Sequence, residues 1–235
     1  KMIIKNLQKL TTIDYPGKLA CTIFIFGCNL RCSFCHNPSL IFKKDSIEIK
    51  KEEVLDFLKR RTKCLDGVCF TGGEPLATLD FEFVSEIKKL GYKIKIDTNG
   101  TYPEKLKQLI DLNLIDYIAM DIKTSKDKYE NLTKSKNLDK IEESIKLISD
   151  FKDYEFRTTI IPTHHTIGNI HQIKEWLLSI SGKTKLKSYY IQSFISRPGN
   201  MLSNEFDCIN SPSDQFLNEI KAVMQQFFEV CKIRN

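Results

Sequence analysis

Segments typical of strands alternate with segments typical of helices along most of this chain, and that alternation limits the possible folds more than any other feature. The expected strands are the apolar runs 19–26, 67–71, 93–98, 116–121, 155–161 and 188–194. The expected helices, with apolar residues three and four apart, are 51–62, 80–90, 103–112, 138–150, 168–180 and 212–230. Six such units predict an α/β fold with a parallel sheet and right-handed crossovers. Six are too few for a complete eight-fold barrel, which leaves a partial barrel and a doubly wound sheet as alternatives.

The chain is expected to form a single domain over residues 1–235, because it contains no linker, internal repeat or low-complexity segment. Within it we expect a short N-terminal extension over 1–18, the strand and helix units over 19–194, and a C-terminal segment with a helix over 195–235. Ser211 and Pro212 predict the start of that last helix, as its N-cap and its first residue.

Composition excludes several classes of function. Hydrophobic residues make up 41% of the chain, which is enough for a sizeable core, but no run approaches the roughly 20 apolar residues that span a bilayer. The net charge of +6 comes mostly from scattered lysines, and no basic stripe with interleaved aromatics indicates nucleic-acid binding. The first residues lack the pattern of a secretion signal. We therefore expect a cytoplasmic protein that binds neither membranes nor nucleic acids.

Eight cysteines in a chain expected to be cytoplasmic indicate metal or redox chemistry rather than disulfides. Three of them, Cys28, Cys32 and Cys35, have the spacing C-x3-C-x2-C and directly follow the first expected strand. The other five form no second cluster of ligands and are expected to be small core residues. These five are Cys21, Cys64, Cys69, Cys208 and Cys231.

The number of cysteines in this loop limits which metal site the loop can form. A closed zinc or iron–sulfur site takes four protein ligands, whereas catalytic sites often leave one position open. Three thiolates on one loop could hold three irons of a [4Fe–4S] cluster and leave the fourth iron for a substrate or cofactor. Alternatively, His36 could complete a Cys3His zinc site, although structural zinc ligands usually come in two separated clusters. The remaining histidines have no ligand spacing and are expected to be solvated; they are His164, His165 and His171.

Three further motifs follow the next three expected strands: Thr71-Gly72-Gly73-Glu74-Pro75, Asp97-Thr98-Asn99-Gly100 and Met120-Asp121-Ile122-Lys123. In barrel-type α/β proteins, reacting groups gather on the loops at the carboxyl ends of the strands. We therefore expect these motifs and the cysteine loop at one rim. Two glycines can let a ligand approach the backbone, or can simply form a turn. Two aspartates on neighbouring strands could do acid–base work.

The cysteine spacing, with the aromatic Phe34 just before the third cysteine, resembles the signature of the radical S-adenosylmethionine (SAM) enzymes. A wider pattern over residues 14–37 resembles the glycyl-radical-enzyme activators. Within these, residues 13–18 (Ile-Asp-Tyr-Pro-Gly-Lys) are most similar to the activating proteins of anaerobic ribonucleoside-triphosphate reductase. The resemblance extends over most of the chain. It implies the partial (β/α)6 TIM-like barrel of the radical SAM type rather than a doubly wound sheet.

The resemblance also implies the cofactors and the residues that bind them. The three loop cysteines would hold a [4Fe–4S] cluster whose fourth iron binds SAM, and Gly72, Gly73 and Glu74 would bind the SAM ammonium group. The other cofactor contacts expected near the cysteine loop are Phe34 and His36.

Four more residues are implied as SAM contacts on later strands. Asp97, Asp121 and Lys123 match motifs that face the ribose and methionine ends of SAM and can gather a small cation. Arg157 matches an arginine that contacts SAM, and a guanidinium suits a carboxylate. The alternatives are a helix cap for Asp97, a simple salt bridge between Asp121 and Lys123, and an outward-facing strand position for Arg157.

The implied activity is that of an oxidoreductase that cleaves SAM reductively and takes hydrogen from a backbone glycine of a partner enzyme. The implied partner is anaerobic ribonucleoside-triphosphate reductase, with a flavodoxin- or ferredoxin-type electron donor. Phe194 stands where pyruvate formate-lyase activators carry a histidine, which weakens assignment to that branch. The alternatives are activation of another glycyl radical enzyme such as pyruvate formate-lyase, a radical SAM enzyme acting on a small molecule, and a non-catalytic zinc- or cluster-binding module.

Overall fold

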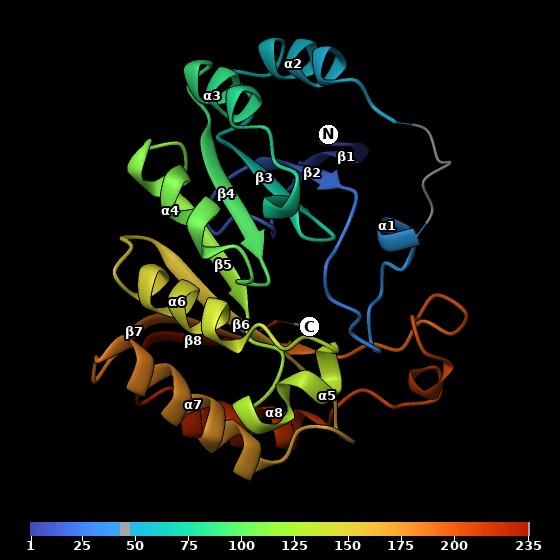
Figure 1. Ribbon diagram of the computed structural model, residues 1–235, viewed down its shortest axis with the longest axis vertical. Coiled ribbons are helices and arrows are strands. Elements are labelled where there is room, and N and C mark those ends of the chain that lie inside the picture. The colour runs from blue at the N-terminus through green and yellow to red at the C-terminus, as the bar shows by residue number, and fades with distance from the viewer. Residues whose placement is uncertain (43–47, 235) are drawn as a thin grey trace. The chain divides into compact units, whose positions relative to one another are not determined.

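The computed structural model describes residues 1–42 and 48–234 (Figure 1). The chain divides into two compact units, which are described separately. The first comprises residues 1–29, 39–98 and 104–118, and the second comprises 30–38, 99–103 and 119–235. Strand β5 (Tyr117–Asp121) begins in the first unit and ends in the second. Within each unit the order of strands in the sheet follows their order in the chain.

The first unit is a sheet with helices after its strands. Its other strands are β1 (Ile4–Thr11), β2 (Ala20–Ile25), β3 (Gly67–Gly72) and β4 (Lys93–Thr98). Its helices are α1 (Ser39–Phe42), α2 (Lys51–Lys59), the short 3-10 turn η1 (Pro75–Ala77), α3 (Phe81–Lys89) and α4 (Pro103–Asp111), whose first residue belongs to the second unit.

Register places the carboxyl ends of β2 and β3 side by side. Strand β1 runs antiparallel to β2, and β2, β3 and β4 run parallel. Ile25, the last residue of β2, is the partner of Gly72, the last residue of β3. The loops that leave these two strands therefore start at the same edge, as expected for a parallel sheet.

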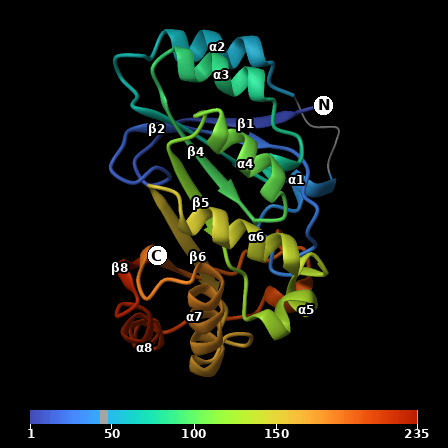
Figure 2. The same cartoon turned by 60° about the vertical axis from the view of Figure 1, so that its left-hand side comes forward.

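Local sequence explains the helices of this unit. Asp80 caps α3, because its carboxylate accepts hydrogen bonds from the backbone N–H groups of Glu82 and Phe83. Helices α2 and α3 pack against each other (Figure 2). Their buried residues lie three and four positions apart, as in Phe83, Val84 and Ile87 of α3.

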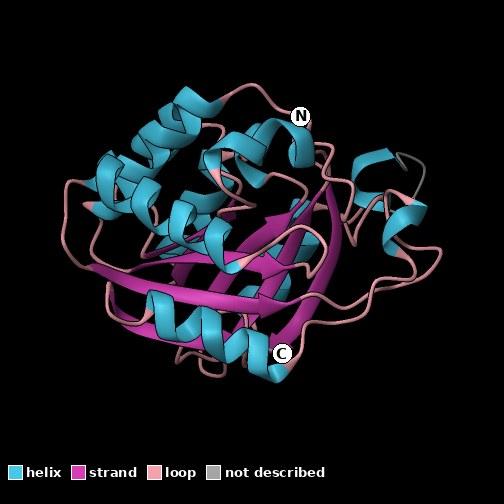
Figure 3. Ribbon diagram, turned by 90° about the horizontal axis from the view of Figure 1, so that it is seen from below, coloured by secondary structure: helices cyan, strands magenta, loops and turns pink. Residues whose placement is uncertain are grey.

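The second unit carries three parallel strands and most of the later helices. Figure 3 colours the strands of the protein magenta and its helices cyan. Its strands are β6 (Tyr154–Ile160), β7 (Leu186–Ser193) and β8 (Phe228–Arg234). Its helices are η2 (Lys126–Lys128), α5 (Tyr129–Thr133), α6 (Leu138–Ser149), α7 (Ile167–Ser181), η3 (Asn204–Phe206) and α8 (Asp214–Met224).

Helix α7 shows how this unit is ordered locally. Thr166 and Asn169 form a capping box at its start, and Gly182 ends it with a positive φ of 68°. Helix α7 packs against both α6 and α8. Trp176 packs its ring on Tyr129 and donates its N–H to Glu142, so that it joins α7 to α5 and α6.

All six expected strands exist, as β2 to β7, and the six expected helices exist as α2, α3, α4, α6, α7 and α8. The prediction for the C-terminal end was wrong in two respects. The N-cap of α8 is Ser213 rather than Ser211, and the helix ends at Met224. The residues that follow form β8, parallel to β7, because Phe228 and Val230 to Ile233 suit a partly buried pleated surface. The N-terminal extension contains strand β1.

Candidate functional site

Two glycines at the end of β3 bring its backbone close to the start of the cysteine loop. A Cβ on Gly72 would lie 2.3 Å from the carbonyl oxygen of Ile25, and Gly72 has a φ of +127°. A Cβ on Gly73 would lie 2.1 Å from the carbonyl oxygen of Gly27 and 3.1 Å from the Cβ of Cys28. Both positions therefore require glycine, and the close approach that they permit is to the segment carrying Cys28.

Glu74 follows these glycines and is fully buried. Its Oε1 accepts hydrogen bonds from the backbone N–H of Leu76, at 3.1 Å, and from the hydroxyl of Thr98, at 2.8 Å. The carboxylate thus caps the turn η1 and joins the ends of β3 and β4. A buried carboxylate with such fixed partners can serve as an oriented acceptor for a cationic group.

Asp97 lies near the end of β4 and pairs with Lys95 two residues earlier. Lys95 has no solvent exposure, although lysine is among the residues least often buried. The two side chains share one face of the strand because they are two residues apart. Lys95 belongs to the candidate site through this pair, but it was not predicted from the sequence. The signal that could have indicated it is a lysine between Ile94 and Ile96, two residues before Asp97 and so on the same face of the strand.

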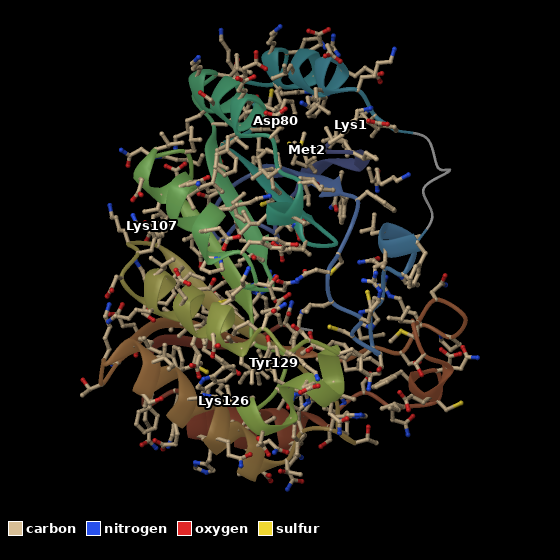
Figure 4. The ribbon with its side chains drawn as sticks, in the orientation of Figure 1. Lys1, Met2, Asp80, Lys107, Lys126 and Tyr129 are labelled. Atoms are coloured by element: carbon tan, nitrogen blue, oxygen red, sulfur yellow. The ribbon has the colours of Figure 1, made fainter. Side chains whose placement is uncertain are left out.

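The rest of the cysteine loop belongs to the second unit, where backbone hydrogen bonds hold it. The N–H of Cys35 donates to the carbonyl of Cys32, and the N–H of Arg31 donates to the carbonyl of Thr133 at the end of α5. Figure 4 labels Tyr129 at the start of this helix. The loop is also held by the segment after β7, because the N–H of Ser203 donates a hydrogen bond to the carbonyl of Ser33.

Aromatic side chains fix the two residues that flank Cys35. Phe34 is buried and lies with its ring centroid 6.2 Å from that of Phe206. The ring of His36 stacks on Phe194 at a centroid distance of 5.4 Å. The Nε2 atom of His36 is buried and has no hydrogen-bond partner. Burial and the charge of Arg197 lower the pKa of His36 below its ordinary value.

A network of charges joins the end of β5 to the middle of β6. The Nε of Arg157 donates to Oδ1 of Asp121 at 2.7 Å, and the Nζ of Lys123 donates to Oδ2 at 2.9 Å. Arg157 is 9% exposed, so its side chain does not face solvent from the strand. The salt bridge between Asp121 and Lys123, considered from the sequence as an alternative, is present.

These neighbours fix the charge states of the network. Burial of the Asp121 carboxyl opposes its ionisation, but the charges of Arg157 and Lys123 outweigh burial and hold its pKa well below the ordinary value. Burial by itself would lower the pKa of Lys123, yet Asp121 and a charge on Cys32 raise it above the ordinary value. The ammonium of Lys123 therefore stays charged near Cys32.

Two expectations from the sequence are corrected by burial. His165 is 1% exposed rather than solvated: its Nδ1 accepts from the Ile161 N–H at 3.1 Å, and its Nε2 lies 3.0 Å from the Lys123 carbonyl oxygen. Burial lowers the pKa of His165 to about 4. Cys64 and Cys208 are exposed rather than core residues, because they lie in turns after α2 and η3. Cys21 and Cys69 are buried as expected, Cys231 is partly buried, and His171 is exposed.

The eight cysteines, all within the residues that the structure describes, form no disulfides. Within residues 1–42 and 48–234, no three His, Cys, Asp or Glu side chains lie together as ligands for a metal ion. The metal role of the cysteine loop therefore stays a prediction. The residues nevertheless fit an iron–sulfur cluster with a bound cofactor: soft thiol donors, the orphaned Nε2 of His36, and a lysine ammonium near Cys32.

Comparison with known proteins identifies the family. Residues 22–177 match the family model of the radical SAM superfamily. A Methanocaldococcus jannaschii protein whose name describes it as a glycyl-radical enzyme activating enzyme is 32% identical to this chain. The alignment covers all of this chain and 96% of the relative. The pyruvate formate-lyase-activating enzyme of Listeria monocytogenes is 31% identical over 68% of this chain and 69% of its own length.

The chain thus belongs to the radical SAM superfamily and, within it, to the glycyl-radical enzyme activating enzymes. It is an enzyme of a class that uses a [4Fe–4S] cluster and SAM. A domain of the pyruvate-formate lyase-activating enzyme from Bacteroides vulgatus is 18% identical, with a TM-score of 0.53 over 72% of this chain and 99% of that chain. The α/β fold of the radical SAM type is confirmed, with parallel strands β2 to β4 in the first unit and β6 to β8 in the second. Among the residues that the structure describes, no helix combines the length and apolar character needed to cross a membrane.

Proposed function

We propose that this protein cleaves SAM reductively at a [4Fe–4S] cluster held by Cys28, Cys32 and Cys35 and generates a glycyl radical on anaerobic ribonucleoside-triphosphate reductase. The observation that carries the proposal is the cysteine loop itself: three cysteines outside any disulfide, in a C-x3-C-x2-C segment of a chain that aligns over its whole length with an activating enzyme. When bound, the cluster and SAM supply the one-electron and hydrogen-abstraction chemistry.

The protein's own residues bind and orient the cofactors. The three thiolates would hold three irons, and the hydrogen bonds of Cys35 and Ser33 to the segment after β7 keep the loop in one conformation. His36, whose ring is fixed on Phe194, would direct its unpartnered Nε2 to bound SAM. Phe34, packed on Phe206, would exclude water from the cluster.

The remaining residues would recognise the polar ends of SAM. Glu74, on the rigid turn after Gly72 and Gly73, would accept from the ammonium group. Arg157 and Lys123, both held by Asp121, would face the carboxylate, for which a guanidinium is a good partner.

Asp97 would accept from the ribose. The small cation expected near Asp97 and Asp121 gains no support, because Lys95, Lys123 and Arg157 already supply the positive charge at these carboxylates.

Residues 13–18 and Phe194 support the choice of partner. The segment Ile-Asp-Tyr-Pro-Gly-Lys resembles the activators of the reductase, and Phe194 occupies the place of a histidine in formate-lyase activators. Thr11 fixes the start of this segment, because its Oγ1 accepts hydrogen bonds from the N–H groups of Ile13 and Asp14. We further propose a flavodoxin- or ferredoxin-type electron donor and a reducing, cytoplasmic setting for an oxygen-sensitive cluster.

The test is activation of two purified partners in parallel. The protein is reconstituted with iron and sulfide under anaerobic conditions and incubated with SAM and dithionite, together with either the anaerobic reductase or pyruvate formate-lyase. We expect a glycyl radical signal in electron paramagnetic resonance only with the reductase. A signal only with formate-lyase would replace the proposed partner by the alternative one. SAM cleavage that needs a small molecule, and no radical on either protein, would contradict activase function altogether.

A further inference from the structure

A buried ion pair joins the last strand to the strand that carries Arg157. Glu155 on β6 has no solvent exposure. Both of its oxygens are bonded by one guanidinium, because Nη1 of Arg234 donates to Oε1 at 2.7 Å and Nη2 donates to Oε2 at 2.9 Å. Such a bidentate pair fixes the orientation of both groups and is stronger than a single hydrogen bond.

Glu155 and Arg157 are two residues apart on β6, so their side chains share one face of the strand. The Nη1 of Arg157 lies 3.8 Å from Oε1 of Glu155, while its Nε donates to Asp121. A continuous row of alternating charges results. In order, it is Lys123, Asp121, Arg157, Glu155 and Arg234.

Strand β8 holds Arg234 in place. Arg234 is its last residue and is paired in register with Gln192 of β7. Its guanidinium lies over the ring of Tyr190, 3.3 Å from the centroid, which is a favourable position for a cation. The side chain is thus fixed by an aromatic face on one side and a carboxylate on the other.

We propose that Arg234 is a positioning residue for SAM binding: by neutralising Glu155 it leaves Arg157 on Asp121, in the orientation that receives the ligand's carboxylate. This inference rests on the proposed role of Arg157 as a SAM contact. It assigns a function to β8, a strand that lies outside the six expected β/α units.

The physical reason is the cost of removing the bidentate partner of a buried charge. If Arg234 is removed, the Glu155 carboxylate stays in a fully buried place with Arg157 within 3.8 Å. Having lost both hydrogen bonds from Arg234, the carboxylate then attracts the guanidinium of Arg157 more strongly, because removing one partner of a buried ion pair is strongly unfavourable. Arg157 shifts along β6 toward Glu155 and away from Asp121, and the site loses the orientation of its guanidinium.

The first experiment compares Arg234→Ala with the double variant Arg234→Ala/Glu155→Gln in the full, reconstituted protein. Equilibrium binding of SAM and the kcat and KM of SAM cleavage under dithionite are measured. We expect Arg234→Ala to raise the Kd and KM for SAM about tenfold, as is typical when an outer partner of a binding residue is lost. The kcat should change less. In the double variant position 155 carries no charge, so Arg157 stays on Asp121 and most of the affinity should return.

Two control variants separate positioning from general damage to β8. Lys232→Ala removes an exposed cation from the same strand and should leave SAM affinity unchanged. Phe228→Leu removes buried packing from β8 and should lower the melting temperature without changing SAM affinity. Equal loss of affinity in the single and double Arg234 variants, or in Phe228→Leu, would show that β8 acts only through stability and would overturn the proposal.

A second measurement does not depend on SAM. In a crystal structure of the Arg234→Ala protein without ligand, Arg157 should bond to Glu155 and leave Oδ1 of Asp121. An Arg157 that remains on Asp121 would refute the positioning role even if SAM affinity fell. If the wild-type protein neither binds nor cleaves SAM, the proposed function fails, while this structure still decides whether Arg234 controls Arg157.

Discussion

The hydroxyl of Thr98 donates a 2.8 Å hydrogen bond to Oε1 of Glu74, so that two motifs that end different strands meet at one buried carboxylate. The same oxygen accepts from the N–H of Leu76. Glu74 is therefore held by β4 as well as by its own turn. A carboxylate ordered from two sides loses little further freedom when it binds a cation, which favours a tight and specific contact.

Glu74→Gln should separate the charge of this residue from its structural role. The amide oxygen can still accept from Thr98 and Leu76, so the fold should persist. Loss of one charge-assisted hydrogen bond should weaken SAM binding about ten- to hundredfold. Glu74→Ala should in addition lower the free energy of unfolding by about 1 kcal/mol through loss of the cap. Equilibrium binding and urea unfolding measure the two effects.

The matched control is Asp80→Ala, which removes the cap of α3 in the same unit. It should cost a similar free energy of unfolding and leave SAM affinity unchanged. Unchanged SAM affinity in Glu74→Gln would remove Glu74 from the binding site.

Cys32→Ala should abolish SAM cleavage with little loss of fold, because a cluster held by two thiolates has lost one of its three protein ligands. Iron content, SAM cleavage under dithionite and far-ultraviolet circular dichroism test this expectation. Cys64→Ala, which changes an exposed cysteine outside the loop, should keep both iron and activity. Cleavage that survives in the Cys32 variant would refute the cluster assignment.

Gly73→Ala should destabilise the start of the cysteine loop. The added Cβ would lie 2.1 Å from the backbone oxygen of Gly27, so the segment carrying Cys28 has to move. Overpacking of this kind costs about 1–3 kcal/mol, which lowers the melting temperature of a chain of this length by about 2–4 °C for each kcal/mol.

The iron content after reconstitution of the Gly73 variant should fall as well. Gly168→Ala is the control, because its nearest contact would be an ordinary 3.6 Å. A Gly73 variant as stable and as iron-rich as the Gly168 variant would show that the close approach is unimportant.

His165 should make stability depend on pH. It is neutral in the folded protein, where burial lowers its pKa to about 4, whereas in the unfolded chain it takes up a proton near its ordinary pKa of about 6.5. As the pH falls from about 6.5 to 4, the unfolded state binds the extra proton, so the free energy of unfolding falls by up to about 3 kcal/mol. Above about pH 6.5 this contribution is constant.

Urea unfolding of the wild type and of His165→Asn at pH 5 and pH 7 measures the effect. At pH 7 the variant should be less stable than the wild type, because it lacks the buried hydrogen bonds of His165 to Ile161 and Lys123. Its free energy of unfolding should differ less between pH 5 and pH 7. His171→Gln, at an exposed position, should keep the wild-type difference. An identical pH dependence in the wild type and in His165→Asn would contradict the neutral, buried state of His165.

The sequence by itself determined most of the elements, though not β8, and it determined the candidate cysteine loop, because these depend on neighbouring residues. Apolar spacing defined strands such as β2 and helices such as α3, and the spacing of Cys28, Cys32 and Cys35 pointed to a cluster with an open iron. Only the tertiary structure decided which charges meet. Arg234 pairs with Glu155 across 79 residues, and His165 is buried against the carbonyl of Lys123, 42 residues away. Local periodicity carries no information about such partners, because burial and charge pairing depend on which strands and loops the chain brings together.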